Sequence, residues 1–79
     1  MNRNDEIDEL YKAVAKNVKK IRIKNNKTQL DIAYNALDYD NDSFYSQLEN
    51  STNNKHFNLK QLYLISKYLD CSMKDFFNE

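Results

Sequence analysis

The sequence predicts a single all-α domain, and three observations lead to this fold class. Apolar residues recur at intervals of three and four, the spacing of one face of an α-helix. Asn, Thr and Ser stand just before several of these stretches, where helices take their N-caps. A chain of 79 residues has room for one small core but not for a second domain.

Composition and charge exclude several classes of protein. Twelve basic and twelve acidic residues give zero formal charge, so the whole chain lacks the basic excess typical of nucleic-acid-binding domains. The charges are separated, however: residues 10–30 carry seven basic and no acidic side chains, and residues 31–54 carry five acidic and no basic ones. No segment resembles a membrane span or a signal peptide, and the lone Cys71 cannot form an internal disulfide. We therefore expect a cytoplasmic protein without a membrane partner.

The first predicted helix runs from about Asp5 to Asn25, with Asn4 as its cap. Acidic residues in its first turn and basic residues in its last turns complement the helix dipole. Its apolar face consists of Ile7, Leu10, Tyr11, Val14, Val18 and Ile21. The chain has no Gly and no Pro, so turns that need a positive φ are expected to use Asn and Asp.

Three further helices and a last turn are predicted. Thr28 begins a second helix, which should end near Asp38; a third follows the acidic turn and ends near Asn50. Asn58 caps a fourth helix, and Ser72 caps a last turn or two. Met73, Phe76 and Phe77 in that last turn are expected to be exposed unless they pack on the core or on a second subunit. The side chains expected to be buried are Ile32, Ala33, Ala36 and Leu37 in the second helix, and Tyr45 and Leu48 in the third. In the fourth helix they are Leu59, Leu62, Ile65 and Leu69.

Three segments resemble the phage repressor and Cro type (XRE-like) helix-turn-helix family. Residues 18–33, VKKIRIKNNKTQLDIA, are similar to the family's first helix and the start of its second. Residues 58–77, NLKQLYLISKYLDCSMKDFF, are similar to its last two helices, and SFYSQLEN resembles the end of its recognition helix. The resemblance covers about residues 14–77, with residues 1–13 as an N-terminal extension of the first helix. It implies a five-helix, lambda-repressor-like fold.

The function implied by this resemblance is that of a sequence-specific DNA-binding transcriptional regulator. Its third helix would read the major groove, which is wide enough for one α-helix. Arg22 and Glu49 would form a structural ion pair, and a homodimer would assemble through Met73, Phe76 and Phe77. The expected DNA contacts are Thr28 and Gln29 at the second helix, Asn41, Asp42, Ser43, Ser46 and Gln47 at the third, and Lys55 and His56 in the loop that follows.

The acidic turn departs from the family pattern and supports a different interpretation. Asp38, Asp40 and Asp42 lie where DNA phosphates would approach, and carboxylates repel a duplex. The turn between the second and third helices and the loop after the third are also longer than is usual in the family. The alternative is therefore a helix-turn-helix scaffold that binds a protein partner through its acidic turn and does not bind DNA.

A calcium site is a third interpretation of the same segment. Its ligands would be Asp38, Asp40, Asp42, Ser46 and Glu49, which have the spacing of an EF-hand loop. Ser43 replaces the glycine of that loop, however, and no apolar helix follows Glu49; Asp and Asn also serve as ordinary turn and cap residues. His56 has no ligand cluster or catalytic partner beside it, so we expect no enzyme activity, cofactor or small-molecule substrate.

Overall fold

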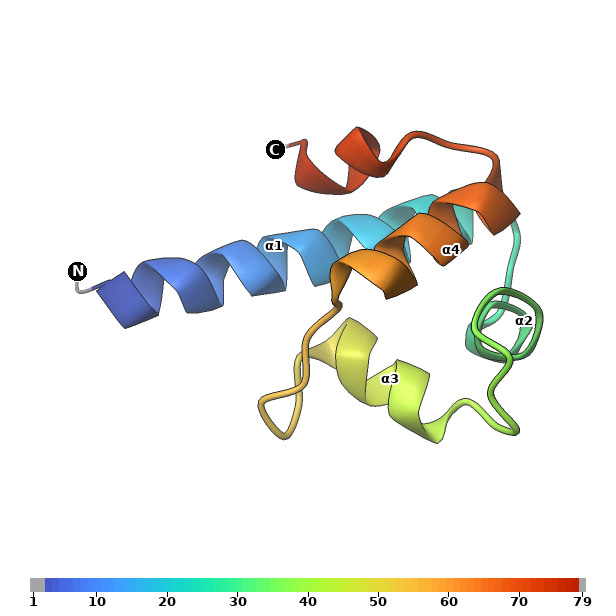
Figure 1. The fold of residues 1–79 in the computed structure, drawn as a ribbon, viewed down its shortest axis with the longest axis horizontal. Helices are drawn as coiled ribbons and strands as arrows, with labels where there is room; N and C mark the ends of the chain where they lie inside the picture. Colours follow the sequence, from blue (N-terminus) through green and yellow to red (C-terminus); the bar gives the residue numbers. More distant parts are fainter. Residues whose placement is uncertain (1–2, 79) are drawn as a thin grey trace.

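A long N-terminal helix, α1 (Arg3–Lys24), runs the length of the molecule, and the later helices fold against its C-terminal two thirds (Figure 1). This computed structural model describes residues 3–78, and all of the regular structure in that range is helical. The all-α prediction is confirmed. The later elements are α2 (Gln29–Asp31), η1 (Ile32–Ala36), α3 (Ser43–Asn50), α4 (Leu59–Leu69) and η2 (Met73–Phe77).

The described residues form four α-helices, so the expected count of five is not reproduced. The second predicted helix starts as α2 but continues as the π-helical segment η1, in which the Leu37 N–H donates to the Ile32 carbonyl at 3.2 Å. The last predicted helix, η2, is a 3₁₀-helix. Short 3₁₀-helices are common at helix ends and in connections, whereas a π-helical segment usually occurs as a single turn associated with an α-helix.

The predicted N-caps of the later helices are confirmed. Thr28 Oγ1 accepts a hydrogen bond from the Asp31 N–H at 3.0 Å, and the Asp31 carboxylate accepts one from the Thr28 N–H at 2.8 Å. Asn58 and Ser72 form the same reciprocal arrangement with Gln61 and Asp75. Each pair satisfies backbone N–H groups that have no partner within the helix, which fixes where the helix begins.

Asn and Asp provide most of the positive-φ turns, as the lack of Gly predicts. Within residues 3–78, the residues with positive φ are Asn26, Asp38, Ser51, Asn53, Asn54 and Asp70. Ser51 and Asp70 are the left-handed C-caps of α3 and α4. Asp38 therefore has a structural role, because its left-handed conformation turns the chain after η1.

The core lies between α1, α3, η1, α4 and η2. Its buried apolar side chains are Val14, Ala15, Val18, Ile32, Ala33, Leu37, Tyr45, Leu48, Phe57, Leu62, Ile65, Leu69 and Phe76. The predicted face of α1 is wrong in the first half of the helix, where Ile7 and Leu10 are exposed. The N-terminal turns of α1 project past the other elements (Figure 1). Leu59, expected to be buried, is 71% exposed at the first position of α4.

Phe76 does not lie on a dimerisation surface. Its side chain is fully buried in the core of the monomer, and its carbonyl accepts a hydrogen bond from Asn17 Nδ2 of α1 at 2.9 Å. Met73 is half-buried against the same core. The predicted interface is therefore wrong for Phe76, because η2 folds back onto α1, and Phe77 is the exposed residue of the three.

Candidate nucleic-acid interface

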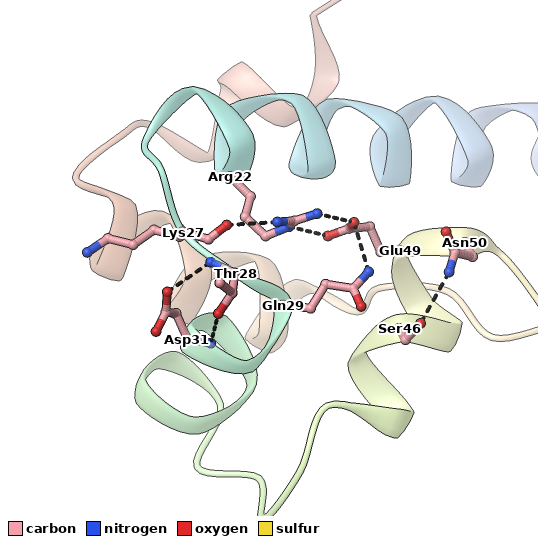
Figure 2. Close-up of polar contacts among 8 residues, drawn as sticks. All are labelled: Arg22, Lys27, Thr28, Gln29, Asp31, Ser46, Glu49 and Asn50. Carbon is pink, nitrogen blue, oxygen red and sulfur yellow. Dashed lines mark hydrogen bonds and ion pairs between the residues drawn. The ribbon is translucent and has the colours of Figure 1, made fainter.

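A buried ion pair between Arg22 and Glu49 joins α1 to α3. Arg22 Nε and Nη2 donate to the two carboxylate oxygens of Glu49, each at 2.8 Å (Figure 2). Arg22 Nη1 donates to the Lys27 carbonyl at 2.7 Å, and Glu49 also accepts a hydrogen bond from Gln29 Nε2 at 3.1 Å. One guanidinium thus holds the end of α1, the chain before α2 and the last turn of α3 in fixed positions. The predicted structural pair is present.

The pair shifts the pKa values of its members in the directions expected for buried partners. Burial alone would raise the pKa of Glu49, but the hydrogen bonds led by those from Arg22 lower it below its usual value. The hydrogen bond to Glu49 raises the pKa of Arg22. Tyr45 lies beside the pair, and burial raises the pKa of its phenol. Both members of the pair are therefore charged throughout the neutral range.

Thr28 and Gln29 are placed by this network at the start of α2. The Thr28 hydroxyl oxygen accepts the capping hydrogen bond described above, while the residue as a whole stays exposed. Gln29 is half-buried, and its side chain extends towards α3 to reach Glu49 (Figure 2). Its amide has one N–H and the carbonyl oxygen left for an outside partner. The two predicted contact residues are therefore adjacent at the surface, and both also have structural roles.

The solvent side of α3 is uncharged and carries polar side chains together with the Phe44 ring, which is 39% exposed. Ser43 is exposed, and Ser46 and Gln47 are half-buried one turn further on. Ser46 Oγ accepts a hydrogen bond from Asn50 Nδ2 at 3.2 Å, and Gln47 Oε1 accepts one from Asn53 Nδ2 at 3.2 Å. These bonds orient the Gln47 amide while leaving its N–H groups to donate. Hydroxyl and amide groups on the outer face of one helix are the groups that read base edges.

Asn50 and Asn53 extend this polar face, and the sequence-based prediction missed both. Asn50 is exposed in the last turn of α3, and Asn53 lies in the loop beyond it. The signal that points to Asn50 is its spacing from Ser43, Ser46 and Gln47, which places it on the same side of the helix. Asn53 carries no such signal, because its position depends on the left-handed turn at Ser51.

The acidic turn is exposed rather than folded back as helix caps. Asp38 and Asp40 are exposed, and Asp42, the N-cap position of α3, makes no side-chain capping bond. The capping bond comes from Asn41, whose Oδ1 accepts from the Ser43 N–H at 2.9 Å. Asn41 therefore has a structural role at the start of α3. The turn thus places exposed carboxylates in the segment that leads into α3.

The structure does not assemble the calcium alternative. Glu49 would be its last ligand, but this side chain is fully buried and its oxygens are bonded to Arg22 and Gln29. Within the described range, no group of three or more His, Cys, Asp or Glu side chains is positioned to hold a metal ion. The EF-hand spacing in the sequence is therefore produced by a helix turn and a structural ion pair.

Lys55 and His56 lie in the loop between α3 and α4, and both are exposed. The Lys55 ammonium lies 5.7 Å from the centroid of the Phe44 ring on α3. The His56 ring stacks on Tyr11 of α1 with centroids 3.8 Å apart. These two residues and Lys12 line a polar hollow of about 370 Å³ that also includes Asp8, Ser51 and Asn54. The ring contacts thus place the Lys55 ammonium near the first turn of α3 and the His56 ring against α1.

Comparisons of the chain with protein-family models, with curated proteins and with solved structures found no match. Between Arg3 and Asn78, no helix is long and apolar enough to cross a membrane.

Proposed function

We propose that this chain is a sequence-specific DNA-binding transcriptional regulator of the helix-turn-helix type, with α3 as the helix that enters the major groove. The observation that carries the proposal is the Arg22–Glu49–Gln29 network, which fixes the start of α2 relative to the end of α3. A helix that reads bases needs such a rigid mount, because base contacts depend on the register of a few side chains. The lambda-repressor-like arrangement of the chain is part of this proposal.

The outer face of α3 provides the chemistry for reading bases. Gln47 has donors and an acceptor that match the N7 and N6 groups of adenine, and the hydroxyls of Ser43 and Ser46 can serve bases or phosphates. Gln29 adds one further amide at the start of α2. Because these groups are uncharged, they contribute to the choice of sequence more than to overall affinity.

Phosphate contacts are assigned to a small set of cations around this face. Lys27 precedes α2, and Lys55 and His56 follow α3. The Lys27 side chain extends away from the buried pair (Figure 2), with its ammonium 5.2 Å from the ring centroid of Tyr68. With so few cations and an acidic turn nearby, we expect weak non-specific binding and a slope of log K against log salt of about −2 to −3.

The regulator is proposed to act in the cytoplasm as a homodimer on two DNA half-sites about one helical turn apart. No catalytic activity, cofactor or small-molecule substrate is assigned to it. Regulation would then depend on the abundance of the protein or on a partner protein.

Fluorescence anisotropy with random and genomic DNA duplexes at about 50 mM salt tests the proposal, because phosphate contacts are strongest at low salt. We expect binding that weakens as salt rises and a subset of genomic sequences that bind more tightly than random duplex. Absence of binding to every duplex at micromolar protein would overturn the assignment.

A second candidate function is the binding of a basic protein surface through the acidic turn. The exposure of Asp38 and Asp40 favours it, because both carboxylates are available to an outside partner at one end of α3. Residues 31–54 carry no basic side chain that would offset them. A lysine-rich peptide that binds the chain, with DNA failing to bind, would support this function over the first.

A further inference from the structure

The N-terminal turns of α1 expose apolar side chains beside an apolar groove. Ile7 and Leu10 are 42% and 54% exposed in the first half of α1, whose N-terminal turns project from the body (Figure 1). Next to them, Leu59 and Phe77 are 71% and 47% exposed. Large apolar side chains are also exposed on the other helices, among them Leu30, Tyr34, Phe44 and Tyr63. Leu10, Leu59 and Phe77 differ from these because they lie together along one groove, and Ile7 is one turn before Leu10 on α1. Exposed apolar residues gathered in this way mark an interaction surface.

The groove beside this patch has room for aliphatic side chains. Its volume is about 320 Å³, and it is lined mainly by apolar residues of α1, the α3–α4 loop, α4 and η2: Leu10, Tyr11, Val14, Phe57, Leu59, Leu62 and Phe77. The same surface therefore offers a ridge, at Ile7, and a hollow that such a ridge can enter. A two-fold interface between identical chains requires this combination, because each copy must supply both halves of the contact.

The charges of α1 complement a second copy in an antiparallel arrangement. Four acidic residues lie in its N-terminal part: Asp5, Glu6, Asp8 and Glu9. From Lys12 onwards α1 carries basic residues and no acidic ones. In an antiparallel pair that crosses near Leu10, the acidic part of each α1 lies beside the basic part of the other. A parallel pair would place like charges side by side and is disfavoured.

We propose that two copies of this chain associate through antiparallel contact of their α1 N-terminal turns, with Ile7 of each copy seated in the groove of the other between Leu59 and Phe77. This surface replaces the interface expected at Met73 and Phe76 and retains Phe77. The inference rests on the homodimer of the proposed function but not on DNA binding, so it is tested on the protein alone.

Sedimentation velocity of the full chain, without DNA, at concentrations up to about 0.1 mM covers dissociation constants in the micromolar range. We expect the mass of a dimer at the upper concentrations. Ile7→Glu and Phe77→Glu should each abolish the dimer, because each places a carboxylate in the apolar contact. Ile23→Glu changes a 53% exposed apolar residue near the other end of α1 and should leave the dimer intact. Circular dichroism checks that all three variants keep their helix content.

Charge reversal tests the antiparallel arrangement separately. Glu6→Lys should raise the dissociation constant of the dimer at least about tenfold, since it places a cation beside the partner's basic segment. Asp40→Lys, which makes the same change in the acidic turn, should leave the constant unchanged. A monomeric wild-type chain, a dimer that survives Ile7→Glu and Phe77→Glu, or equal effects of Glu6→Lys and Asp40→Lys would each overturn the proposal. DNA binding by a monomeric chain would leave the regulator assignment standing while removing this interface.

Discussion

Arg22 of α1 donates two hydrogen bonds to Glu49 of α3 across the core, and Glu49 accepts a third from Gln29 at the start of α2. One buried carboxylate thus joins the last turn of α3 to the end of α1, 27 positions earlier, and to the start of α2, 20 positions earlier. The carboxylate itself is fully buried, and the guanidinium side chain is 10% exposed. Removing either partner leaves a charge without compensation, and this gives the first prediction.

Arg22→Met should destabilise the fold by about 3–5 kcal/mol, because Glu49 would remain buried and unpaired. The double variant Arg22→Met with Glu49→Met should lose less than the sum of the single variants, since it removes both charges together. Urea denaturation gives the free energies of unfolding. Lys24→Met, at an exposed position on the same helix, is the control and should change stability by less than about 0.5 kcal/mol. Additive effects of the two single variants would contradict the pairing.

The helix starts were predictable because they depend on residues only three positions apart. Thr28, Asn58 and Ser72 each form a reciprocal capping arrangement with the residue at the third helical position. Such local interactions are specified by the sequence itself. The Arg22–Glu49 pair was expected for a different reason: the two residues are 27 positions apart, and the family resemblance, rather than spacing or charge, pointed to their contact.

The errors of the sequence-based prediction concern how the helices meet. The 3–4 spacing of Ile7, Leu10 and Leu59 marks the apolar side of a helix but does not tell where the neighbouring elements end. All three are exposed: Ile7 and Leu10 lie in the first half of α1, and Leu59 is the first residue of α4. Phe76 is the reverse case, because nothing local to η2 indicates that the segment folds back onto α1. Asn17 supplies the hydrogen bonds that anchor it there, from 59 residues earlier in the chain.

Acid should weaken the fold partly through Glu49. Its pKa in the folded chain is below its unfolded value of about 4.3, so at low pH the unfolded chain binds more protons than the folded one. The stabilisation by the charged carboxylate is present above that unfolded value and is lost as pH falls through the lower folded pKa. Urea midpoints between pH 7 and pH 3 measure this loss. In Glu49→Gln the urea midpoint should be lower than that of the wild-type chain at pH 7 and should fall less steeply between pH 7 and pH 3. An equal slope in both proteins would show that Glu49 is not a source of this acid sensitivity.

Tyr45→Phe should leave stability unchanged or raise it by up to about 1 kcal/mol. The ring is fully buried, and the hydroxyl, although close to Arg22 and Glu49, has no hydrogen-bond partner of regular geometry among the described residues. Burying a hydroxyl without a partner has a cost, which the substitution removes while keeping the packing of the ring. Tyr45→Ala is the contrasting variant and should lose about 3–5 kcal/mol through the cavity it creates. Thermal and urea unfolding report both values, and a large loss in Tyr45→Phe would show that the hydroxyl contributes to the network.

Gln47→Ala and Lys55→Ala should affect DNA binding in different ways. If α3 reads bases, loss of the Gln47 amide should cost about 1–3 kcal/mol on the preferred sequence and little on random duplex. Loss of the Lys55 ammonium should weaken binding to all duplexes similarly and reduce the salt slope by about 1. Anisotropy titrations on preferred and random duplexes at several salt concentrations separate the two patterns. Equal losses on both duplexes for Gln47→Ala would show that this residue does not choose sequence.

Neutralising the acidic turn decides between the two proposed functions. Asp38→Asn with Asp40→Asn keeps residues that tolerate the left-handed and turn conformations, so the fold should be retained. If α3 enters the major groove, removing two carboxylates beside it should strengthen binding to every duplex, most strongly at low salt, because repulsion of phosphates is relieved. If the turn is instead the contact for a basic protein surface, the same variant should lose affinity for a lysine-rich peptide and gain none for DNA. Asp70→Asn, at the left-handed C-cap of α4 outside the turn, removes one negative charge and is therefore compared with the single variants Asp38→Asn and Asp40→Asn. If Asp70→Asn raises the affinity for DNA as much as a single substitution in the turn does, the aspartates of the turn act only through the net charge of the chain.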